Sequence, residues 1–300
     1  MKNRKTLEYY VLDVFTNESY KGNPLSVVFT NGNLELEQYE KIAREFGYSE
    51  TSFVYYSKTK KALRVRSFTP TGFEVDGAGH NLLGAVCAAL LKKMDIFNEQ
   101  TGNPFVIMKE TPIPILIDFD STNQLPIVKM KQKPATIEAS IPAEVIAKAI
   151  GLSTEDLEVP NFIPTIVQTE VAHLMVPIKS LETLDKIKTD NNHLITISKQ
   201  NHFEGFYCFA FTSEKVGTIV QSRFFNPLIG IDEDAATGTA AGPLAGLLNK
   251  QNIIQSNKEY QILQGVQLNQ PSLIKVMVTE NNVLVGGSSV ITMEGKIYLT

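Results

Sequence analysis

The stretch RSFTPTGFEVDGAGH at residues 66–80 returns later in the chain as RFFNPLIGIDEDAATGT at residues 223–239. Both copies run from a strand-like segment through Phe-x-Pro and an acidic loop to a glycine. Each copy then enters a run of small and apolar residues. We interpret the two copies as an internal duplication, which in a chain of 300 residues predicts two similar domains.

The runs that follow the two copies predict two buried helices. Residues 82–91 and 240–248 are apolar on every side, and each run is too short to cross a membrane. We expect Pro243 near the start of the second helix, where a missing N–H costs least. Many short alternating strands lie around these runs. A sheet wrapped around each helix is the arrangement that buries such helices, so we predict an α+β fold.

The domain limits follow from the loop at residues 121–124. We expect residues 1–120 to form the first domain and residues 121–285 the second, although this loop is equally compatible with an ordinary hairpin turn. We expect the final strand, residues 286–300, to pack back on the first domain.

Composition excludes several classes of function. The net charge of −4 offers no electrostatic footprint for nucleic acid. No stretch approaches the roughly 20 apolar residues needed to span a bilayer, and the N-terminus lacks a signal-peptide core, so we expect a cytoplasmic protein without a membrane partner. Two cysteines in apolar segments and four histidines without ligand spacing predict neither a disulfide framework nor a metal site. The absence of dinucleotide and P-loop motifs leads us to expect no cofactor.

The two glycine-containing loops predict the binding of an anion. At a helix start, free backbone N–H groups and the positive end of the helix dipole attract negative charge. We expect two such starts, one from each copy, to hold one carboxylate of a small-molecule substrate.

Three ionisable side chains near these loops are candidates for proton transfer. Glu50 lies directly after a predicted helix and before an apolar strand, where partial burial would raise its pKa toward the range of a general acid or base. His80 follows Gly79, where the helix dipole favours a neutral ring. Asp234 occupies the matching second loop.

Each of these candidates has an alternative structural role. Glu50 is compatible with a carboxylate that bonds only to nearby backbone, His80 with a helix-cap histidine, and Asp234 with an N-cap aspartate. The sequence does not rank Asp234 above its acidic neighbours Asp76, Asp232 and Glu233. No thiol precedes Gly79 or Gly238, so two opposed cysteine bases are excluded there, and oxygen or imidazole groups must move the proton.

Several motifs together resemble the phenazine biosynthesis PhzF-like family, and they span nearly the whole chain. They are Gly22-Asn23-Pro24, Ser49-Glu50-Thr51, Phe68-Thr69-Pro70, Ala78-Gly79-His80, Glu233-Asp234-Ala235-Ala236-Thr237-Gly238-Thr239 and Val285-Gly286-Gly287. The resemblance implies a diaminopimelate-epimerase-like fold. In such a fold two similar domains, each an antiparallel or mixed β barrel around a central helix, are related by a pseudo-twofold duplication, and the active site lies in the cleft between them.

The resemblance also implies roles for individual residues. Glu50, His80 and Asp234 match the family's acid/base glutamate, its Gly-His histidine and its motif aspartate, so we expect them to be catalytic. Residues expected to bind the substrate are Gly79, Asn81, Gly238 and Thr239. Thr239 stands where the family has serine, which adds a methyl group to the pocket. Ala235 replaces the usual proline, and Gln270 falls where an arginine often precedes Pro-Ser.

The resulting hypothesis is a cofactor-independent isomerase that moves a proton at carbon in a small carboxylate, with Glu50 as acid/base. One alternative is an amino-acid racemase or epimerase that uses Glu50 and Asp234 as opposed bases. Another is a protein that binds a carboxylate without catalysis. The resemblance further implies a homodimer, and family membership alone does not fix the substrate.

Overall fold

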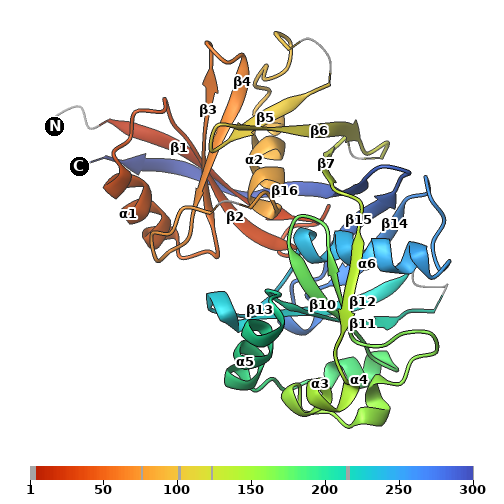
Figure 1. Cartoon of the computed structure of the whole chain (residues 1–300). Coiled ribbons are helices and arrows are strands. Elements are labelled where there is room, and N and C mark those ends of the chain that lie inside the picture. The colour runs from red at the N-terminus through yellow and green to blue at the C-terminus, as the bar shows by residue number, and fades with distance from the viewer. Residues whose placement is uncertain (1–4, 76, 101–102, 123, 214–216, 300) are drawn as a thin grey trace. The chain divides into compact units, whose positions relative to one another are not determined.

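The computed structural model describes residues 5–75, 77–100, 103–122, 124–213 and 217–299. The chain forms two compact units (Figure 1), and each is described by itself. The first unit comprises Met1–Met130 and Gly286–Thr300, and the second comprises Lys131–Val285.

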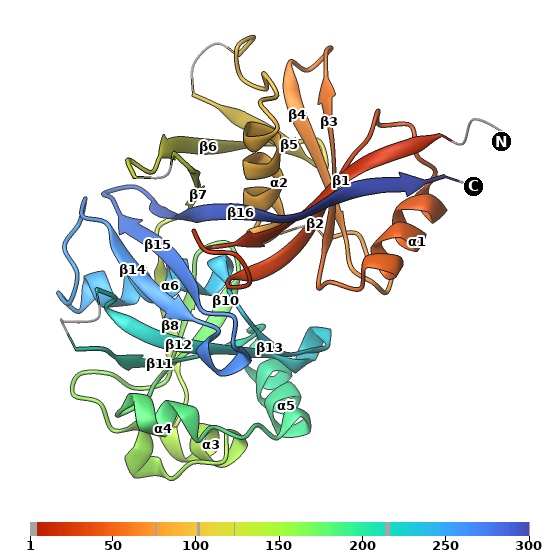
Figure 2. The same cartoon turned by 180° about the vertical axis from the view of Figure 1, so that it is seen from behind.

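The first unit is a closed barrel. Its described strands pair in the order β1-β2-β3-β4-β5-β6-β7-β16, and β16 pairs with β1 to complete the ring. Figure 2 shows β1 and β16 side by side along much of their length. The strands are β1 (Thr6–Val14), β2 (Asn23–Phe29), β3 (Thr51–Ser57), β4 (Ala62–Phe68), β5 (Phe105–Met108), β6 (Thr111–Phe119), β7 (Pro126–Gln132) and β16 (Val283–Tyr298).

Two helices belong to this barrel. Helix α2 (His80–Leu91) packs against β1, β2, β3 and β4, and every residue from His80 to Ala89 is buried. Its apolar surface on all sides leaves only the barrel interior as a place to fold, as the sequence predicts. Helix α1 (Leu36–Phe46) instead packs on the outside through Tyr39, which stacks on Phe68 at a centroid distance of 5.2 Å.

The second unit wraps a sheet around the other central helix. Its strands pair in the order β15-β14-β12-β11-β10-β9-β8, with β13 beside β12. Helix α6 (Gly238–Lys250) packs against β8, β9, β10 and β15, so strands from both ends of this row reach it. The strands are β8 (Thr136–Ser140), β9 (Thr165–Gln168), β10 (Ala172–Pro177), β11 (Phe206–Phe211), β12 (Val220–Asn226), β13 (Ile231–Asp234), β14 (Tyr260–Gln264) and β15 (Ser272–Val278).

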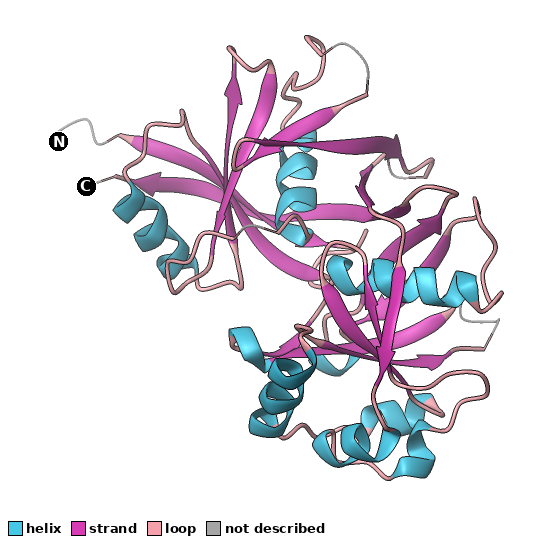
Figure 3. Cartoon of the chain, viewed as in Figure 1, coloured by secondary structure: helices cyan, strands magenta, loops and turns pink. Residues whose placement is uncertain are grey.

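Three shorter helices belong to the second unit: α3 (Ala143–Ala149), α4 (Leu181–Asp185) and α5 (Asn191–Asn201). Figure 3 shows all three as helices separate from α6. They share one hydrophobic cluster with β10 and β11, which includes Ile146, Leu184, Leu194 and Phe206. This cluster gives the unit a second apolar layer.

Strands β6 and β7 pair as an antiparallel hairpin, and the Asp120 N–H donates to the Leu125 carbonyl next to the loop at residues 121–124, of which residue 123 lies outside the described residues. The chain passes to the second unit farther along, within β7 between Met130 and Lys131, and returns within β16 between Val285 and Gly286. Helix α6 begins earlier than we expected, so Pro243 lies inside it rather than near its start.

The buried side chain of His173 makes the stability of the second unit depend on pH. Its side chain is 1% exposed, its Nδ1 accepts the Gly205 N–H at 3.2 Å, and burial lowers its pKa to about 3. The folded-state pKa is thus below the value of 6.5 in the unfolded chain. Stability from the neutral ring is fully present above pH 6.5 and is lost as the pH falls toward 3.

We therefore expect His173→Gln to flatten the acid dependence of unfolding. Gln offers the Gly205 N–H an acceptor that does not titrate. In the wild-type protein, protonation of His173 in the unfolded chain should lower the free energy of unfolding by roughly 2 kcal/mol between neutral pH and pH 5. Urea unfolding at pH 7.5 and pH 5 measures the difference, and exposed His202→Asn serves as the control. Equal acid sensitivity of His173→Gln and the wild-type protein would contradict this prediction.

Candidate active site

The structure brings Glu50 and His80 together at the entrance to α2. Glu50 directly precedes β3, and His80 is the first residue of α2. Glu50 Oε2 lies 4.0 Å from His80 Nδ1, and the side chains are 19% and 10% exposed. This separation exceeds a hydrogen bond but is short enough for direct electrostatic interaction.

Buried hydroxyl groups form hydrogen bonds in the strands next to this pair. The hydroxyls of Ser26 and Thr51 lie 2.7 Å apart, and those of Ser52 and Ser67 lie 2.8 Å apart. Ser52 also donates to the Asn81 carbonyl at 3.0 Å. Because Ser52 has one proton to give, Ser67 must be the donor to Ser52. The Ser52–Asn81 bond ties the start of β3, directly after Glu50, to the start of α2, whose first residue is His80.

His80 is held in its neutral form. Burial lowers the pKa of His80, and the nearby Glu50 carboxylate opposes this shift without reversing it. Its position at the N-terminus of α2 acts in the same direction as burial. Among the described residues, no hydrogen-bond partner reaches the buried Nε2. The site therefore combines an acidic side chain with an uncharged imidazole.

Asn81 closes the loop in front of α2. Its Oδ1 accepts the N–H groups of Gly79 and Leu82, each at 2.7 Å, and its Nδ2 donates to the Gly77 carbonyl at 3.0 Å. We expected Gly79 and Asn81 to bind the substrate, but here the Gly79 amide and the Asn81 side chain bond to each other. A carboxylate would have to displace Asn81 Oδ1 to reach the Gly79 N–H.

In the second unit, Asp234 is the last residue of β13 and is held by its neighbours. Thr237 Oγ1 donates to Asp234 Oδ2 at 2.6 Å. The fully buried Gln264 donates through Nε2 to the Asp234 carbonyl and to Thr237 Oγ1, and its Oε1 accepts from Tyr207 and from the Thr237 N–H. Thr237, not Asp234, occupies the N-cap position of α6.

Gly238 and Thr239 are the first two residues of α6, with Gly238 buried and Thr239 partly exposed. The next two amides, of Ala240 and Ala241, donate back to the Thr237 carbonyl. Within the part of the chain that is described, no acceptor lies on the N–H groups of Gly238 and Thr239.

The competing acidic residues have other partners or fall outside the description. Glu233 forms a two-bond pair with Arg223, at 2.9 and 2.7 Å, and Asp232 accepts from Asn191 at 2.7 Å. Asp76 lies outside the described residues. The first unit contains the counterpart of the Glu233 pair, because Arg66 and Glu74 are joined by two bonds of 2.7 and 2.8 Å.

Two further observations concern metal ions and membranes. Across the described ranges, no group of three or more His, Cys, Asp or Glu side chains is arranged to hold a metal ion. No described helix is both long and apolar enough to span a bilayer.

Comparisons with known proteins agree with the motifs. A family model described as phenazine biosynthesis-like protein matches residues 12–295. The trans-2,3-dihydro-3-hydroxyanthranilate isomerase of Pseudomonas aeruginosa is 31% identical over 300 residues, with 97% of this chain and 99% of that protein covered.

Solved structures confirm the predicted fold. A PhzF-family phenazine biosynthesis protein of Bacillus anthracis matches with a TM-score of 0.87 and 26% identity, covering 98% of this chain and 100% of that chain. A probable proline racemase of Agrobacterium radiobacter matches with a TM-score of 0.62 over 98% of this chain and 93% of that chain. At 9% identity, this second likeness shows the fold alone.

Proposed function

Since this chain belongs to the phenazine biosynthesis-like family and is an isomerase, we propose that it moves a proton between carbon atoms of a small carboxylate, without a cofactor and with Glu50 as the acid/base. An isomerisation leaves the composition of the substrate unchanged. The proton taken from one carbon must therefore be replaced at another, and one carboxylate can perform both transfers.

The Glu50–His80 pair is the observation that carries this proposal. The Glu50 side chain is mostly buried yet retains an exposed edge, so a substrate can reach a carboxylate that is largely shielded from water. Neutral His80, 4.0 Å away, adds no positive charge that would stabilise ionised Glu50 and weaken it as a base.

The other predicted residues complete the proposal. Neutral His80 can donate or accept a hydrogen bond as charge moves in the substrate. The amides of Gly238 and Thr239 bind a carboxylate at the start of α6, and Asp234, held by Thr237, orients the substrate. We propose that Gly79 joins this set when Asn81 releases its amide.

The class of substrate can be proposed from a named relative and from two residues of the site. The relative from Pseudomonas aeruginosa is named for trans-2,3-dihydro-3-hydroxyanthranilate, a carboxylate. In this chain, Thr239 adds one methyl group to the proposed substrate site where the family has serine. Ala235 replaces the family's usual proline in the same loop. We therefore propose a related small carboxylate, with that compound as the first to be tested.

Turnover in deuterated water tests the proposal. The wild-type protein is incubated with trans-2,3-dihydro-3-hydroxyanthranilate and with a panel of amino and aromatic carboxylates, and products are followed by NMR and mass spectrometry. We expect a shifted double bond with deuterium at carbon in the product. Inversion of a stereocentre without a double-bond shift would establish the racemase alternative. Thermal stabilisation without any exchange would indicate a binding protein and contradict the proposal.

A further inference from the structure

The first unit contains a groove on its outside, where α1 packs beside β1 and the end of β16. Figures 1 and 2 both show α1 next to the C-terminal end of β16. The groove has a volume of about 560 Å³, within the range of about 300–1,000 Å³ that small-molecule sites occupy. None of the residues that line it is among those proposed for catalysis, so it is distinct from the candidate active site.

The floor of the groove is apolar and only partly covered. Tyr9, Phe46, Ile297 and Leu299 pack against the hydrophobic cluster under α1 and remain partly exposed. The Tyr9 and Phe46 rings meet edge to face, with their centroids 5.0 Å apart. Tyr9 lies opposite Gly295 of β16, and a Cβ on residue 295 would come within 2.8 Å of the Tyr9 ring. The missing side chain at Gly295 therefore gives this ring room to lie against the strand.

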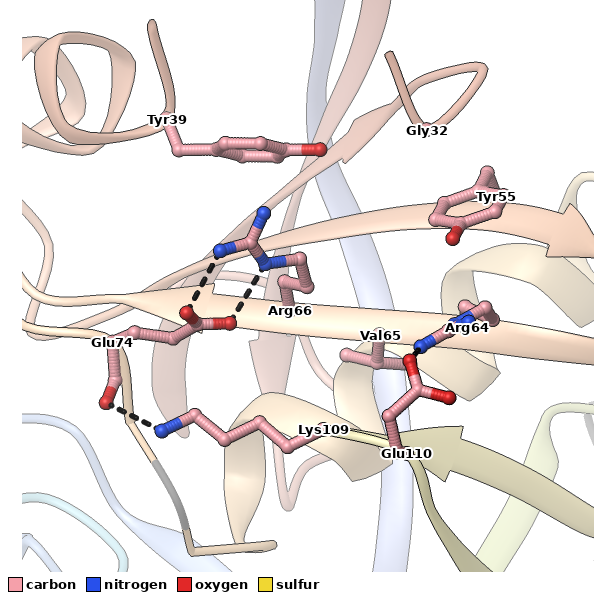
Figure 4. A pocket seen from close by; sticks show the side chains of 9 residues that line it. All are labelled: Gly32, Tyr39, Tyr55, Arg64, Val65, Arg66, Glu74, Lys109 and Glu110. Atoms are coloured by element: carbon pink, nitrogen blue, oxygen red, sulfur yellow. Dashed lines mark hydrogen bonds and ion pairs between the residues drawn. The ribbon is translucent and has the colours of Figure 1, made fainter. Parts of the chain in front are cut away.

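The aromatic rings of the groove are not used by cations of the chain itself. Among the described residues, no lysine or arginine lies over the rings of Tyr9, Phe46 or Tyr298. The nearby Tyr39 differs, because Figure 4 shows Arg66 against its ring, with the guanidinium carbon 4.4 Å from the ring centroid. The face of an aromatic ring attracts a cation. The groove thus offers this attraction to a ligand.

The charged side chains that line the groove are Lys41 and Glu45, both on α1. Lys41 Nζ lies 2.7 Å from Glu37 Oε1, four residues earlier on the same helix. Glutamate four residues before lysine is a better order on a helix than the reverse, so Lys41 stays with Glu37 rather than with Glu45. Within the described part of the chain, the exposed Glu45 carboxylate forms no ion pair. A ligand therefore meets a negative charge beside aromatic rings.

We propose that this groove binds an organic cation with an apolar body, such as a hydrophobic amine or quaternary ammonium compound, whose positive charge lies between the aromatic rings and the Glu45 carboxylate. The apolar body covers Ile297 and Leu299, which are left partly exposed in the floor. The proposal is independent of the isomerase reaction, because it uses none of the residues assigned to proton transfer.

Calorimetric titration with benzyltrimethylammonium at low ionic strength tests the proposal, and benzyl alcohol is the uncharged comparison. We expect saturable binding of the cation and at least about 3-fold weaker binding of the alcohol. Glu45→Gln should weaken binding of the cation about 3-fold, the effect of one exposed ion pair. Tyr298→Leu keeps an apolar side chain but loses the ring, so it should weaken binding by a similar factor.

Lys41→Gln tests the sign of the preferred charge. This change removes a positive charge and leaves the Glu37 carboxylate without its partner, so binding of the cation should tighten by about 2-fold. The matched control is Glu144→Gln, which alters an exposed glutamate on α3 of the second unit and should leave the affinity unchanged. All four altered side chains are exposed, and thermal unfolding without the probe checks that each variant is folded.

The proposal is overturned if the cation does not bind, or if Glu45→Gln and Tyr298→Leu leave its affinity unchanged, since it then binds elsewhere. Weaker binding of the cation by Lys41→Gln would overturn it as well, because the groove would then not favour positive charge. Sedimentation velocity without the probe tests the alternative occupant, a second copy of the chain. A dimer that dissociates on Tyr298→Leu would assign the groove to that second copy and overturn the proposal.

Discussion

Glu50→Gln should lower the rate of turnover and of deuterium incorporation by at least about 100-fold, the usual effect of losing a general base. Gln keeps the shape of the side chain and its place before β3, while the buried bonds of Thr51 and Ser52 hold the backbone unchanged. The lost property is the ability to accept a proton from carbon. We therefore expect kcat to fall while KM changes little, because the amides proposed to bind the carboxylate are untouched.

Glu37→Gln provides the control for this experiment, since Glu37 is an exposed glutamate of the same unit, paired with Lys41 on α1. It should retain the wild-type rate. Deuterium incorporation by Glu50→Gln at the parental rate would remove Glu50 from the mechanism, and the Asp234 carboxylate would then be the base to test.

The central elements of the fold could be predicted because their signals are local. An apolar surface on every side of residues 82–91 has no explanation except burial, and the structure places α2 inside the barrel. The three smaller helices of the second unit were not predicted. α3 and α4 are 7 and 5 residues long, and α5 has little amphipathic pattern, so their stability comes from the shared hydrophobic cluster.

The candidate site could be predicted only in part, because some of its contacts join residues that lie far apart in the sequence. The motifs identify Glu50, His80 and Asp234, but nothing local indicates that Gln264 and Tyr207 hold the Asp234 loop. Their bonds join β11 and β14 to the start of α6, so only the folded chain brings them together. The same holds for Asn81, whose side chain could be assigned to the substrate or to the loop until its partners were known.

The repeated arginine is the clearest case of a signal present in the sequence whose role appears only in three dimensions. Arg66 and Arg223 open the two copies, and each lies over the phenylalanine two residues later, at 5.1 Å from Phe68 and 5.0 Å from Phe225. Each also binds the glutamate of its own return loop. Both units thus contain an Arg–Glu pair, Arg66–Glu74 or Arg223–Glu233, that holds the loop leading into the central helix, and each such pair is called a clamp below.

The two clamps should differ in strength because they differ in burial. Arg223 and Glu233 are 10% and 13% exposed, whereas Arg66 and Glu74 are 34% and 23% exposed. Removing the charge of one partner leaves the other charge uncompensated, which is expensive only where water is excluded. We expect Glu233→Gln to destabilise the second unit by about 3 kcal/mol and Glu74→Gln to destabilise the first by about 1 kcal/mol.

Urea unfolding of the two variants measures this difference, with each transition followed separately because two units need not unfold together. Changing both partners of the buried clamp, in Arg223→Met with Glu233→Leu, should recover part of the loss, since no charge then stays buried without a partner. Equal losses for Glu233→Gln and Glu74→Gln would show that burial does not set the strength of these clamps. A larger loss for Glu74→Gln than for Glu233→Gln would contradict the expected order outright.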